Sequence, residues 1–425
     1  MQTHFTDFQL RDPHIADANG ILRKCVHCGF CTATCPTYVL GGDELDSPRG
    51  RIYLIKNMLE KGEAATPETV KHIDRCLSCN ACMTTCPSGV NYMHLVDHAR
   101  AHIEETFKRP LIERLQRAVL AFVMPRPKLF RLALISAKLA SPLRPLLQAL
   151  GAKRFAAMLG ILPKQLQAPM KMGQPGTYPA IGQTKGRVAL LMGCVQSVLD
   201  PGINAATIRL LNRLGYEIVV TTGEACCGSI THHMGKEVDA LARAKRMIDR
   251  WIEAKVEYII ITTSGCGVTI KDYGHMLRLD EAYADKAKVI SAKARDISEF
   301  LGQLDLPPAR MSLRVAYHSA CTLQHGQQIK TQPQALLKRA GFDVIEVPEG
   351  HLCCGSAGTY NMMQPEIAGK LRDRKIANIT STKPQLIATG NIGCINQIAG
   401  ATAIPILHTV ELLDWAYGGP KPEKI

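Results

Sequence analysis

Residues 25–36, CVHCGFCTATCP, and residues 76–87, CLSCNACMTTCP, carry the same arrangement of four cysteines followed by a proline. In each stretch three cysteines are separated by two residues, and a fourth follows after three more residues. Three thiolates on such a tight loop can bind one metal cluster, whereas the fourth is carried away from it by the intervening residues. The two stretches therefore predict an N-terminal region that is built around metal.

The spacing is typical of two 4Fe-4S clusters that exchange their fourth ligands. We predict that cluster 1 is bound by Cys25, Cys28, Cys31 and Cys86, and that cluster 2 is bound by Cys76, Cys79, Cys82 and Cys35. Zinc is the alternative, because paired CxxC spacings also suit tetrahedral zinc. Zinc requires neither the third cysteine step nor the trailing Cys-Pro, so clusters are favoured. Interleaved ligands make the clusters neighbours, which favours electron transfer.

The remaining eight cysteines form a second pattern, which is duplicated in the C-terminal half. The first copy recurs at offsets of 127, 127 and 128 residues, as Cys194, Cys226-Cys227 and Cys266, then Cys321, Cys353-Cys354 and Cys394. Simple burial is the alternative, since free cysteines are often buried. Eight cysteines in register across a duplication exceed what packing requires, so we predict a redox site or an additional cluster at these positions.

Strands and helices are predicted to alternate around these cysteines. Residues 217–221 and 258–262 are short, β-branched runs of the kind found in buried parallel strands, and residues 236–254 have helical periodicity. Ligands of such sheets gather beyond the carboxyl ends of the strands, where Cys194, Cys266 and Cys394 are expected.

The predicted fold class is therefore α+β and multidomain. A mostly α-helical, ferredoxin-like two-cluster domain is expected at residues 1–105, and a basic helical connector at 106–186, with the linker proper at 165–186. Duplicated α/β Cys-Cys-Gly lobes with parallel sheets are expected at 187–305 and 306–425.

Charge is concentrated in one segment. The net charge is +14, and residues 114–199 contain thirteen Lys or Arg and no Asp or Glu. No run of apolar residues is long enough to span a membrane. Residues 111–124 and 129–147 mix apolar clusters with basic residues, as interfacial helices do, so we predict reversible attachment to an anionic membrane surface. A solvated linker and a nucleic-acid patch are the alternatives, and nucleic acid is disfavoured because aromatic residues make up only 5% of the chain.

Cysteine usage also predicts a compartment. Sixteen cysteines in 425 residues could form a disulfide framework, but such frameworks belong to short secreted chains, and the sequence opens without a basic, apolar secretory segment. We therefore expect reduced cysteines in the cytoplasm, with peripheral attachment to the inner membrane.

Other polar residues give weaker signals. His232 and His233 follow one Cys-Cys-Gly, and His318 precedes Cys321. An imidazole there can ligate metal, move protons or cap a helix, and we favour a structural role for each. No Walker or Rossmann fingerprint is present, and no catalytic residue is predicted.

Three stretches carry a resemblance to a known family. Residues 25–38, 48–56 and 352–360 (CVHCGFCTATCPTY, PRGRIYLIK and LCCGSAGTY) are similar to those of the iron-sulfur subunits of bacterial glycolate oxidase, also called glycolate dehydrogenase. The resemblance implies that flavoprotein partner subunits hold FAD and oxidise glycolate to glyoxylate, while this chain carries electrons towards membrane quinone. Subunits of lactate and glycerol 3-phosphate dehydrogenases share the Cys-Cys-Gly arrangement and remain alternatives.

Heterodisulfide-reductase-like domains resemble the lobes too, which leaves thiol oxidoreduction as a further alternative. Those domains end in CxxC and use five cysteines for one cluster. Thr263 and Asn391 stand at the first of those positions here, so each lobe keeps four cysteines.

Overall fold

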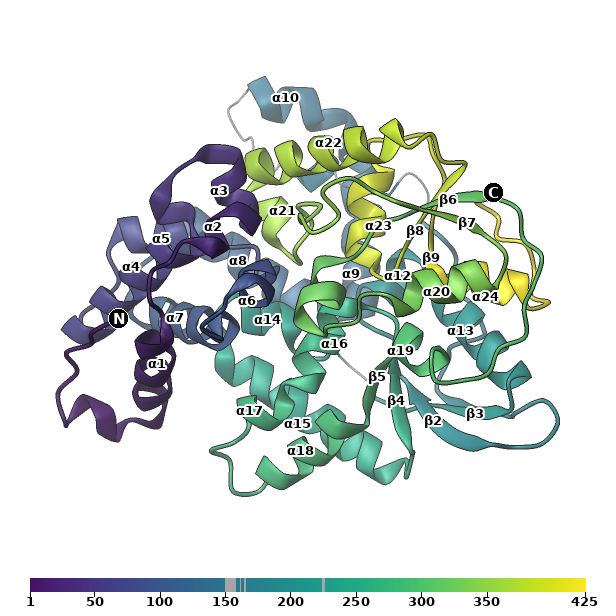
Figure 1. The fold of residues 1–425 in the computed structure, drawn as a ribbon, viewed down its shortest axis with the longest axis horizontal. Helices are drawn as coiled ribbons and strands as arrows, with labels where there is room; N and C mark the ends of the chain where they lie inside the picture. The colour runs from purple at the N-terminus through teal and green to yellow at the C-terminus, as the bar shows by residue number, and fades with distance from the viewer. Residues whose placement is uncertain (150–157, 161, 164–165, 224–225) are drawn as a thin grey trace.

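The structure is a computed structural model that describes residues 1–149, 158–160, 162–163, 166–223 and 226–425. Figure 1 shows an N-terminal helical region on one side and two sheets with their helices on the other. No helix in these ranges is long and apolar enough to cross a membrane.

The N-terminal region is helical, as predicted. Proline begins several of its helices, and the side chains of Asp12, Ser47 and Thr66 accept backbone N–H groups at three of these starts. Its core contains Leu22, Ile55 and other fully buried residues. The helices are α1 (Pro13–Lys24), α2 (Phe30–Thr34), α3 (Pro36–Gly41), α4 (Pro48–Lys61), α5 (Pro67–Asp74), α6 (Ala81–Thr85) and α7 (Tyr92–Thr106).

The connector forms short helices, α8 (Leu111–Val123), α9 (Pro127–Leu139) and α10 (Arg144–Ala149), with a 3-10 turn at Ser141–Leu143. Their outer faces expose large apolar side chains, among them Leu115, Phe122, Leu132 and Leu139. Three basic residues of the acid-free segment, Lys153, Arg154 and Lys164, lie outside the described residues.

The first lobe is built on a sheet of strand order β1-β3-β2-β4-β5, comprising β1 (Gly176–Tyr178), β2 (Gly186–Leu190), β3 (Tyr216–Val220), β4 (Tyr258–Ile261) and β5 (Ala294–Asp296). All pairings are parallel except β1 with β3. The predicted linker thus contributes an antiparallel edge strand that its composition did not indicate. The helices are α12 (Gln196–Leu199), α13 (Pro201–Arg213), α14 (Ser229–His233), α15 (Glu237–Glu253), α16 (Ser264–Lys271), α17 (Tyr273–Met276), α18 (Ala284–Lys293) and α19 (Ile297–Leu301).

The second lobe repeats this plan with a fully parallel sheet of order β7-β6-β8-β9, comprising β6 (Arg314–Tyr317), β7 (Asp343–Glu346), β8 (Leu386–Thr389) and β9 (Ile406–His408). Cys321 is followed by a π-helical turn at Thr322–Gly326. The helices are α20 (Gln332–Arg339), α21 (Tyr360–Met363), α22 (Pro365–Ser381), α23 (Ile392–Ala399) and α24 (Thr409–Ala416).

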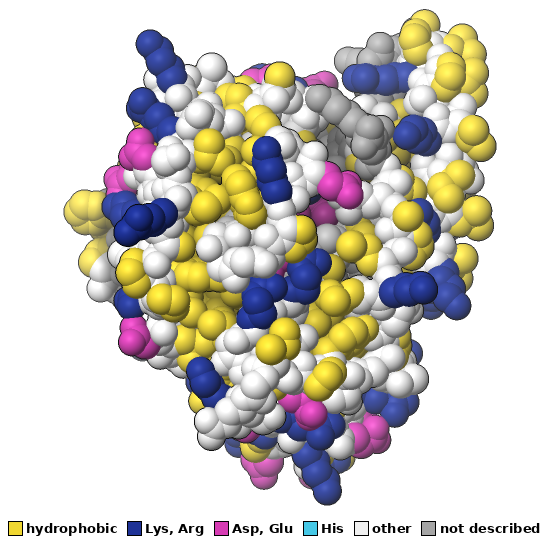
Figure 2. All heavy atoms as spheres, turned by 90° about the vertical axis from the view of Figure 1, so that its right-hand side faces the viewer, with side chains coloured by type: hydrophobic (Ala, Val, Ile, Leu, Met, Phe, Trp, Pro, Cys, Tyr) yellow, Lys and Arg dark blue, Asp and Glu magenta, His cyan; other side chains and the backbone are white. Residues whose placement is uncertain are grey.

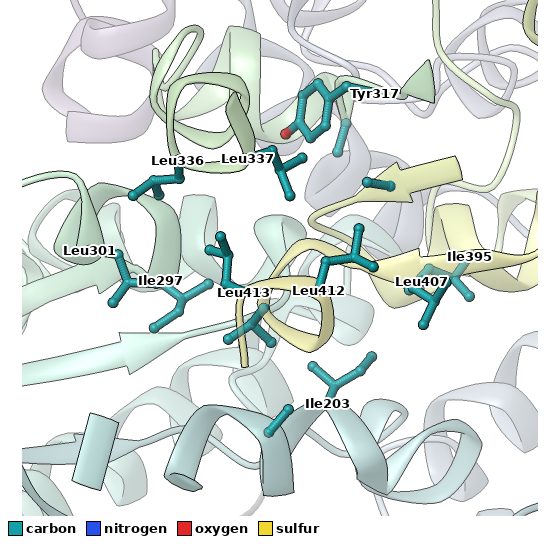
Figure 3. Close-up of a cluster of buried hydrophobic side chains, with 14 of the residues drawn as sticks. Ile203, Ile297, Leu301, Tyr317, Leu336, Leu337, Ile395, Leu407, Leu412 and Leu413 are labelled. Carbon is teal, nitrogen blue, oxygen red and sulfur yellow. The ribbon is translucent and has the colours of Figure 1, made fainter. Parts of the chain in front are cut away.

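The two lobes share one hydrophobic core. Figure 3 shows Ile203 of α13 beneath Leu412 and Leu413 of α24, with Ile297 beside them. Asp414 strengthens the contact, because Arg209 and Arg213 both donate to its carboxylate. The lobes are thereby fixed against each other, and their cysteine-bearing edges share one cavity.

Candidate metal centres

The two four-cysteine loops adopt the same unusual backbone conformation. His27 and Gly29 in the first loop, and Ser78 and Asn80 in the second, all have positive φ. Alternation of left-handed residues turns successive backbone N–H groups to one side and forms a concave nest for an anionic group. An iron-sulfur cluster with four thiolates is such a group, so the repeated strain fits the predicted cofactor.

The first cluster site is the cavity lined by the predicted ligands of cluster 1, Cys25, Cys28, Cys31 and Cys86. Cys28 is exposed, and its neighbours Val26 and Phe30 are 67% and 63% exposed. Cys82 lines the same cavity. The first cluster site therefore lies at the surface, next to the exposed apolar side chains of Val26 and Phe30.

The second cluster site is a neighbouring cavity lined by the predicted ligands of cluster 2, Cys76, Cys79, Cys82 and Cys35. None of them forms a disulfide. Burial raises the pKa of Cys79 and of Cys82 well above its usual range, so these thiols lose their protons only beside a cation. Cys82 belongs to the walls of both cavities, which makes the two sites adjacent.

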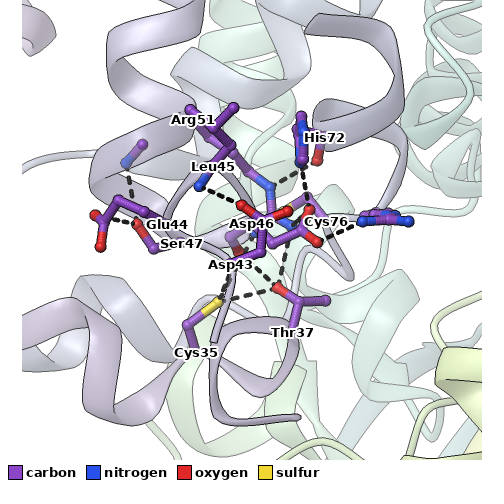
Figure 4. Close-up of polar contacts among 12 residues, drawn as sticks. Cys35, Thr37, Asp43, Glu44, Leu45, Asp46, Ser47, Arg51, His72 and Cys76 are labelled. Atoms are coloured by element: carbon purple, nitrogen blue, oxygen red, sulfur yellow. Dashed lines mark hydrogen bonds and ion pairs between the residues drawn. The ribbon is translucent and has the colours of Figure 1, made fainter. Parts of the chain in front are cut away.

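A buried arginine stands beside the second cluster site (Figure 4). The Nε of Arg51 donates to the His72 carbonyl oxygen at 2.7 Å, and its Nη2 donates to Thr37 Oγ1 at 3.0 Å. Its Nη1 lies 3.8 Å from Cys35 Sγ. Although burial opposes it, the thiols of Cys76 and Cys35 raise the pKa of Arg51. Arg51 therefore supplies a permanent positive charge to the thiolates of this site.

Asp46 balances this charge network. Its carboxylate accepts from Arg51 at 3.4 Å, from Arg75 at 2.7 Å and from His72 Nδ1 at 2.8 Å. Asp43, Asp46 and His72 come close enough to bind a cation, but the two arginines already neutralise Asp46. Arg51 is not among the site residues predicted from the sequence, although it lies in the stretch 48–56 that carries the family resemblance.

Close packing of the backbone requires a glycine at the third position of each Cys-Cys-Gly motif. Gly228 and Gly355 have φ of +90° and +87°, and a Cβ at either would lie 2.9 or 2.6 Å from a backbone oxygen, of Ala240 or Ala368. Their N–H groups donate to Cys226 Sγ and Cys353 Sγ at 3.4 Å. The same turn thus presents a cysteine pair in both lobes.

All eight duplicated cysteines line one cavity of about 570 Å³ between the lobes, a shared cavity that the sequence did not indicate. The thiols pair in the same way in each lobe. Cys321 Sγ lies 3.6 Å from Cys353 Sγ, and Cys354 Sγ lies 3.3 Å from Cys394 Sγ. In the first lobe a hydrogen bond with Cys226 raises the pKa of Cys194.

The second lobe directly adjoins the second cluster site. Cys79 packs in one cluster with Cys321 and Cys353, and Tyr360 Oη donates to the Arg75 carbonyl oxygen at 3.0 Å. The cysteines of the first lobe pack within their own lobe instead. Sequence spacing gave no indication of this asymmetry.

Histidines occupy two different environments. His232 and His233 contact Asp97 at 3.3 and 3.4 Å, so the structural role favoured for both agrees with their contacts. Next to them, His94 donates towards Asp272 at 2.8 Å and stacks on His275. These residues join α7 to the first lobe.

His318 differs from the other predicted histidines. It is 1% exposed, and neither ring nitrogen has a hydrogen-bond partner among the described residues. Burial lowers the pKa of His318 to about 3, so the ring is neutral. A structural role does not account for two unpaired nitrogens.

The class of protein follows from these sites: an iron-sulfur protein that joins a two-cluster domain to two cysteine-rich lobes. Residues 24–90 match the 4Fe-4S dicluster domain family, and residues 188–271 and 315–399 each match the Cysteine-rich domain family. The predicted fold class is confirmed.

Similarity to curated proteins defines the family further. The chain is 44% identical to the glycolate oxidase iron-sulfur subunit of Escherichia coli (strain K12), over 98% of this chain and 99% of that one. It is 33% identical to the probable glycolate oxidase iron-sulfur subunit of Bacillus subtilis (strain 168), over 89% and 88%. Lactate utilization protein A of Bacillus licheniformis is 26% identical over 54% of this chain and 99% of its own length. The chain belongs to the family of glycolate oxidase iron-sulfur subunits, which confirms the resemblance.

Proposed function

We propose that the chain is the electron-transfer subunit of a flavin-dependent glycolate dehydrogenase complex. Oxidation of glycolate to glyoxylate at the flavin of a partner subunit releases two electrons and two protons. This chain carries the electrons, and a membrane quinone takes them up with two protons to become a quinol. The carrying observation is that the first cluster site, the second cluster site and the second lobe form one continuous row.

Electrons enter at the first cluster site under this proposal. Clusters bound there and at the second site supply reversible one-electron transfer, which suits a flavin that gives up its two electrons singly. The exposed Cys28 and the apolar side chains of Val26 and Phe30 offer a docking surface for the flavoprotein. No catalytic residue for glycolate is assigned to this chain.

Electrons leave through the Cys-Cys-Gly half, towards a membrane face formed by the connector. Helices α8 and α9 expose Leu115, Phe122, Leu132 and Leu139 on segments that also carry Arg and Lys. Figure 2 shows hydrophobic side chains interspersed with Lys and Arg along the upper right edge of the molecule. Such a surface supports reversible binding to anionic lipid on the cytoplasmic side of the inner membrane.

The eight cysteines of the lobes serve as further redox ligands in this proposal. Their convergence on one cavity also favours a second candidate, thiol oxidoreduction, because about 570 Å³ accommodates a small disulfide beside them. Reduction of a disulfide would consume the two electrons and two protons. Activity of the isolated, reduced chain on small disulfides, absent from a Cys353→Ser variant, would favour this candidate.

The test of the relay is substitution of its ligands in the assembled complex. Cys28→Ser and Cys79→Ser should abolish glycolate-dependent quinone reduction while glycolate still reduces the partner's flavin. Met83→Leu, a volume-conserving change in the second loop, is the matched control and should retain activity. Full quinone reduction by either cysteine variant would disprove the relay.

A further inference from the structure

His318 is placed to act as a metal ligand. It follows β6 directly, and its N–H donates to the Ala388 carbonyl oxygen at 2.8 Å, which fixes the backbone. Its ring lies next to Cys354 and Cys394, because one ring nitrogen and both Sγ atoms lie within 4.8 Å of one another. A buried imidazole without hydrogen-bond partners is costly unless another group binds it.

The thiols beside it have the spacing of a metal's ligand shell. Two thiolate sulfurs on one tetrahedral metal, with bonds of about 2.3 Å, lie roughly 3.8 Å apart. The Sγ atoms of Cys354 and Cys394 are 3.3 Å apart, and those of Cys321 and Cys353 are 3.6 Å apart. These distances require little adjustment to admit metal.

A buried cation lies at the same place. Lys375 is 2% exposed and donates to the Glu349 carbonyl oxygen at 2.8 Å. The pKa of Lys375 is lowered by burial and raised by the neighbouring thiols of Cys354 and Cys353. The Glu349 carboxylate also raises the pKa of Lys375 but is already paired with Arg374, so an anionic thiolate centre would add to the counter-charge of this ammonium.

The first lobe has the same scaffold but lacks the imidazole, and its buried cation near the cysteines is held differently. Leu191 occupies the position of His318, since its N–H donates to the Ile260 carbonyl oxygen at 3.0 Å directly after β2. On α15, the buried Met247 and Ile248 are the residues that correspond to Lys375 under the offset of 127 or 128 residues. The buried cation of that lobe, Arg243, already has a partner, because its Nε lies 3.0 Å from Asp239.

We propose that the second lobe holds a redox-active iron centre bound by the His318 imidazole and the adjacent thiolates of Cys354 and Cys394, with the remaining coordination supplied from Cys321 and Cys353. The first lobe, with Leu191, has no imidazole ligand. Thiolate and imidazole together suit iron and zinc. Iron is assigned because Cys79 of the second cluster site packs against Cys321 and Cys353, in line with an electron path.

The choice of iron over zinc and the role in electron transfer rest on the proposed function, whereas the metal site itself does not. The step is the transfer of one electron from the second cluster site, which reduces the centre from ferric to ferrous. The electron then leaves to the acceptor, so no covalent bond is made or broken.

The test is the metal content of the full chain, purified anaerobically, in wild type and in His318→Leu and His318→Cys variants. Iron, zinc and sulfide per chain are measured together with EPR of the reduced protein. His318→Leu should lose iron stoichiometrically and keep the signals of both cluster sites, and His318→Cys, which restores a ligand, should retain the iron. His233→Leu is the matched control, because His233 lines the same cavity from the first lobe.

Pulsed EPR of wild type carrying nitrogen-15 histidine gives a second readout, since both cluster sites have only cysteine ligands. A nitrogen coupling that disappears in His318→Leu supports the proposal. Equal iron in wild type and His318→Leu would overturn it, and so would loss of zinc instead of iron. If His318→Leu fails to fold and loses all signals, the iron content of His318→Cys is the deciding measurement. Iron retained in His318→Cys supports the centre. Iron lost from His318→Cys with both cluster signals intact overturns it. If the wild-type complex contains all of its iron but does not reduce quinone, the proposed electron relay is contradicted and the proposed iron site is not.

Discussion

The two Cys-Cys-Gly lobes have the same backbone but differ in the side chains that surround their cysteines. Both hold a left-handed glycine after the cysteine pair, and both hold that pair through the same N–H···S contact. The first lobe then has Leu191 where the second has His318, directly after the equivalent strand. Duplication has preserved the turn that presents the thiols and has allowed the neighbouring side chains to diverge.

The difference also extends to their neighbours. The second lobe places Cys321 and Cys353 against Cys79, whereas the first lobe meets the N-terminal region through histidines and Asp97. Equivalent cysteines in one fold therefore need not share a role. The predictions below compare matched substitutions in the two lobes.

The largest difference is expected from Cys353→Ser compared with Cys226→Ser. Loss of Cys353 removes a ligand next to the second cluster site, so quinone reduction should fall by more than about 100-fold, beyond the range typical of outer-shell changes at metal sites. Cys226→Ser, off the proposed path, should reduce turnover by less than about tenfold. Steady-state turnover of the assembled complex measures both. Equal losses would show that the lobes act together rather than in the asymmetric way proposed.

The next effect concerns stability and should be large in both lobes. Gly228→Ala and Gly355→Ala each force a non-glycine residue into the left-handed region, which costs about 1–3 kcal/mol. The added Cβ would also meet a backbone oxygen, at 2.9 Å in the first lobe and 2.6 Å in the second. Thermal unfolding should therefore show a lower Tm for both variants and the lower one for Gly355→Ala. An unchanged Tm at either position would contradict the close-packing explanation.

A smaller effect is expected from the buried cations. Lys375→Met should weaken iron retention by up to about tenfold, at the lower end of outer-shell effects, because the thiolates of the second lobe lose their counter-charge. Arg243→Met should leave iron retention unchanged, since Asp239, the partner of Arg243, is partly exposed and can be solvated. Iron release to a chelator measures both variants. Faster release from Arg243→Met would place iron in the first lobe instead.

The sequence predicted those parts of the site that depend on local spacing. The four-cysteine motifs predict two ligand sets, whose residues line two adjacent cavities, and the offset of 127 residues predicts the duplicated lobes. Assignment of each cysteine as a ligand stays a prediction, as do the domain boundaries.

The remaining features depend on contacts between distant residues. Arg51 reaches Cys35 only because α4 packs against α2, which ends at its C-cap Cys35, and Cys79 meets Cys321 across more than two hundred residues. The unpaired state of His318 is likewise a property of the folded neighbourhood, not of the residue type. Edge strand β1 was missed because three residues in a Gly- and Pro-rich stretch carry no periodic signal.

The smallest effect is expected from acidification, which should weaken one of the two interfaces of the N-terminal region before the other. Burial lowers the pKa of His98 and of His275 to about 4. Both line the recess between α7 and the first lobe. The separated surfaces would bind protons at these two histidines from about pH 6.5 downwards, so their contribution to docking is complete above that pH and is lost as the pH falls towards 4. His232 in the same recess opposes this loss in part, because Asp97 raises its pKa against the effect of burial.

The interface with the second lobe depends on the packing of Tyr360 and Cys79 and includes His325, which contacts Thr84 and whose pKa burial also lowers. Hydrogen exchange at pH 7, 5.5 and 4.5, corrected for intrinsic rates, should show α17 losing protection before α21. His275→Gln should reduce this difference, because it removes one of the titrating rings. Simultaneous loss of protection in α17 and α21 would mean that the lobes and the N-terminal region open as one cooperative unit, with the shared core of Figure 3 outweighing the local histidines.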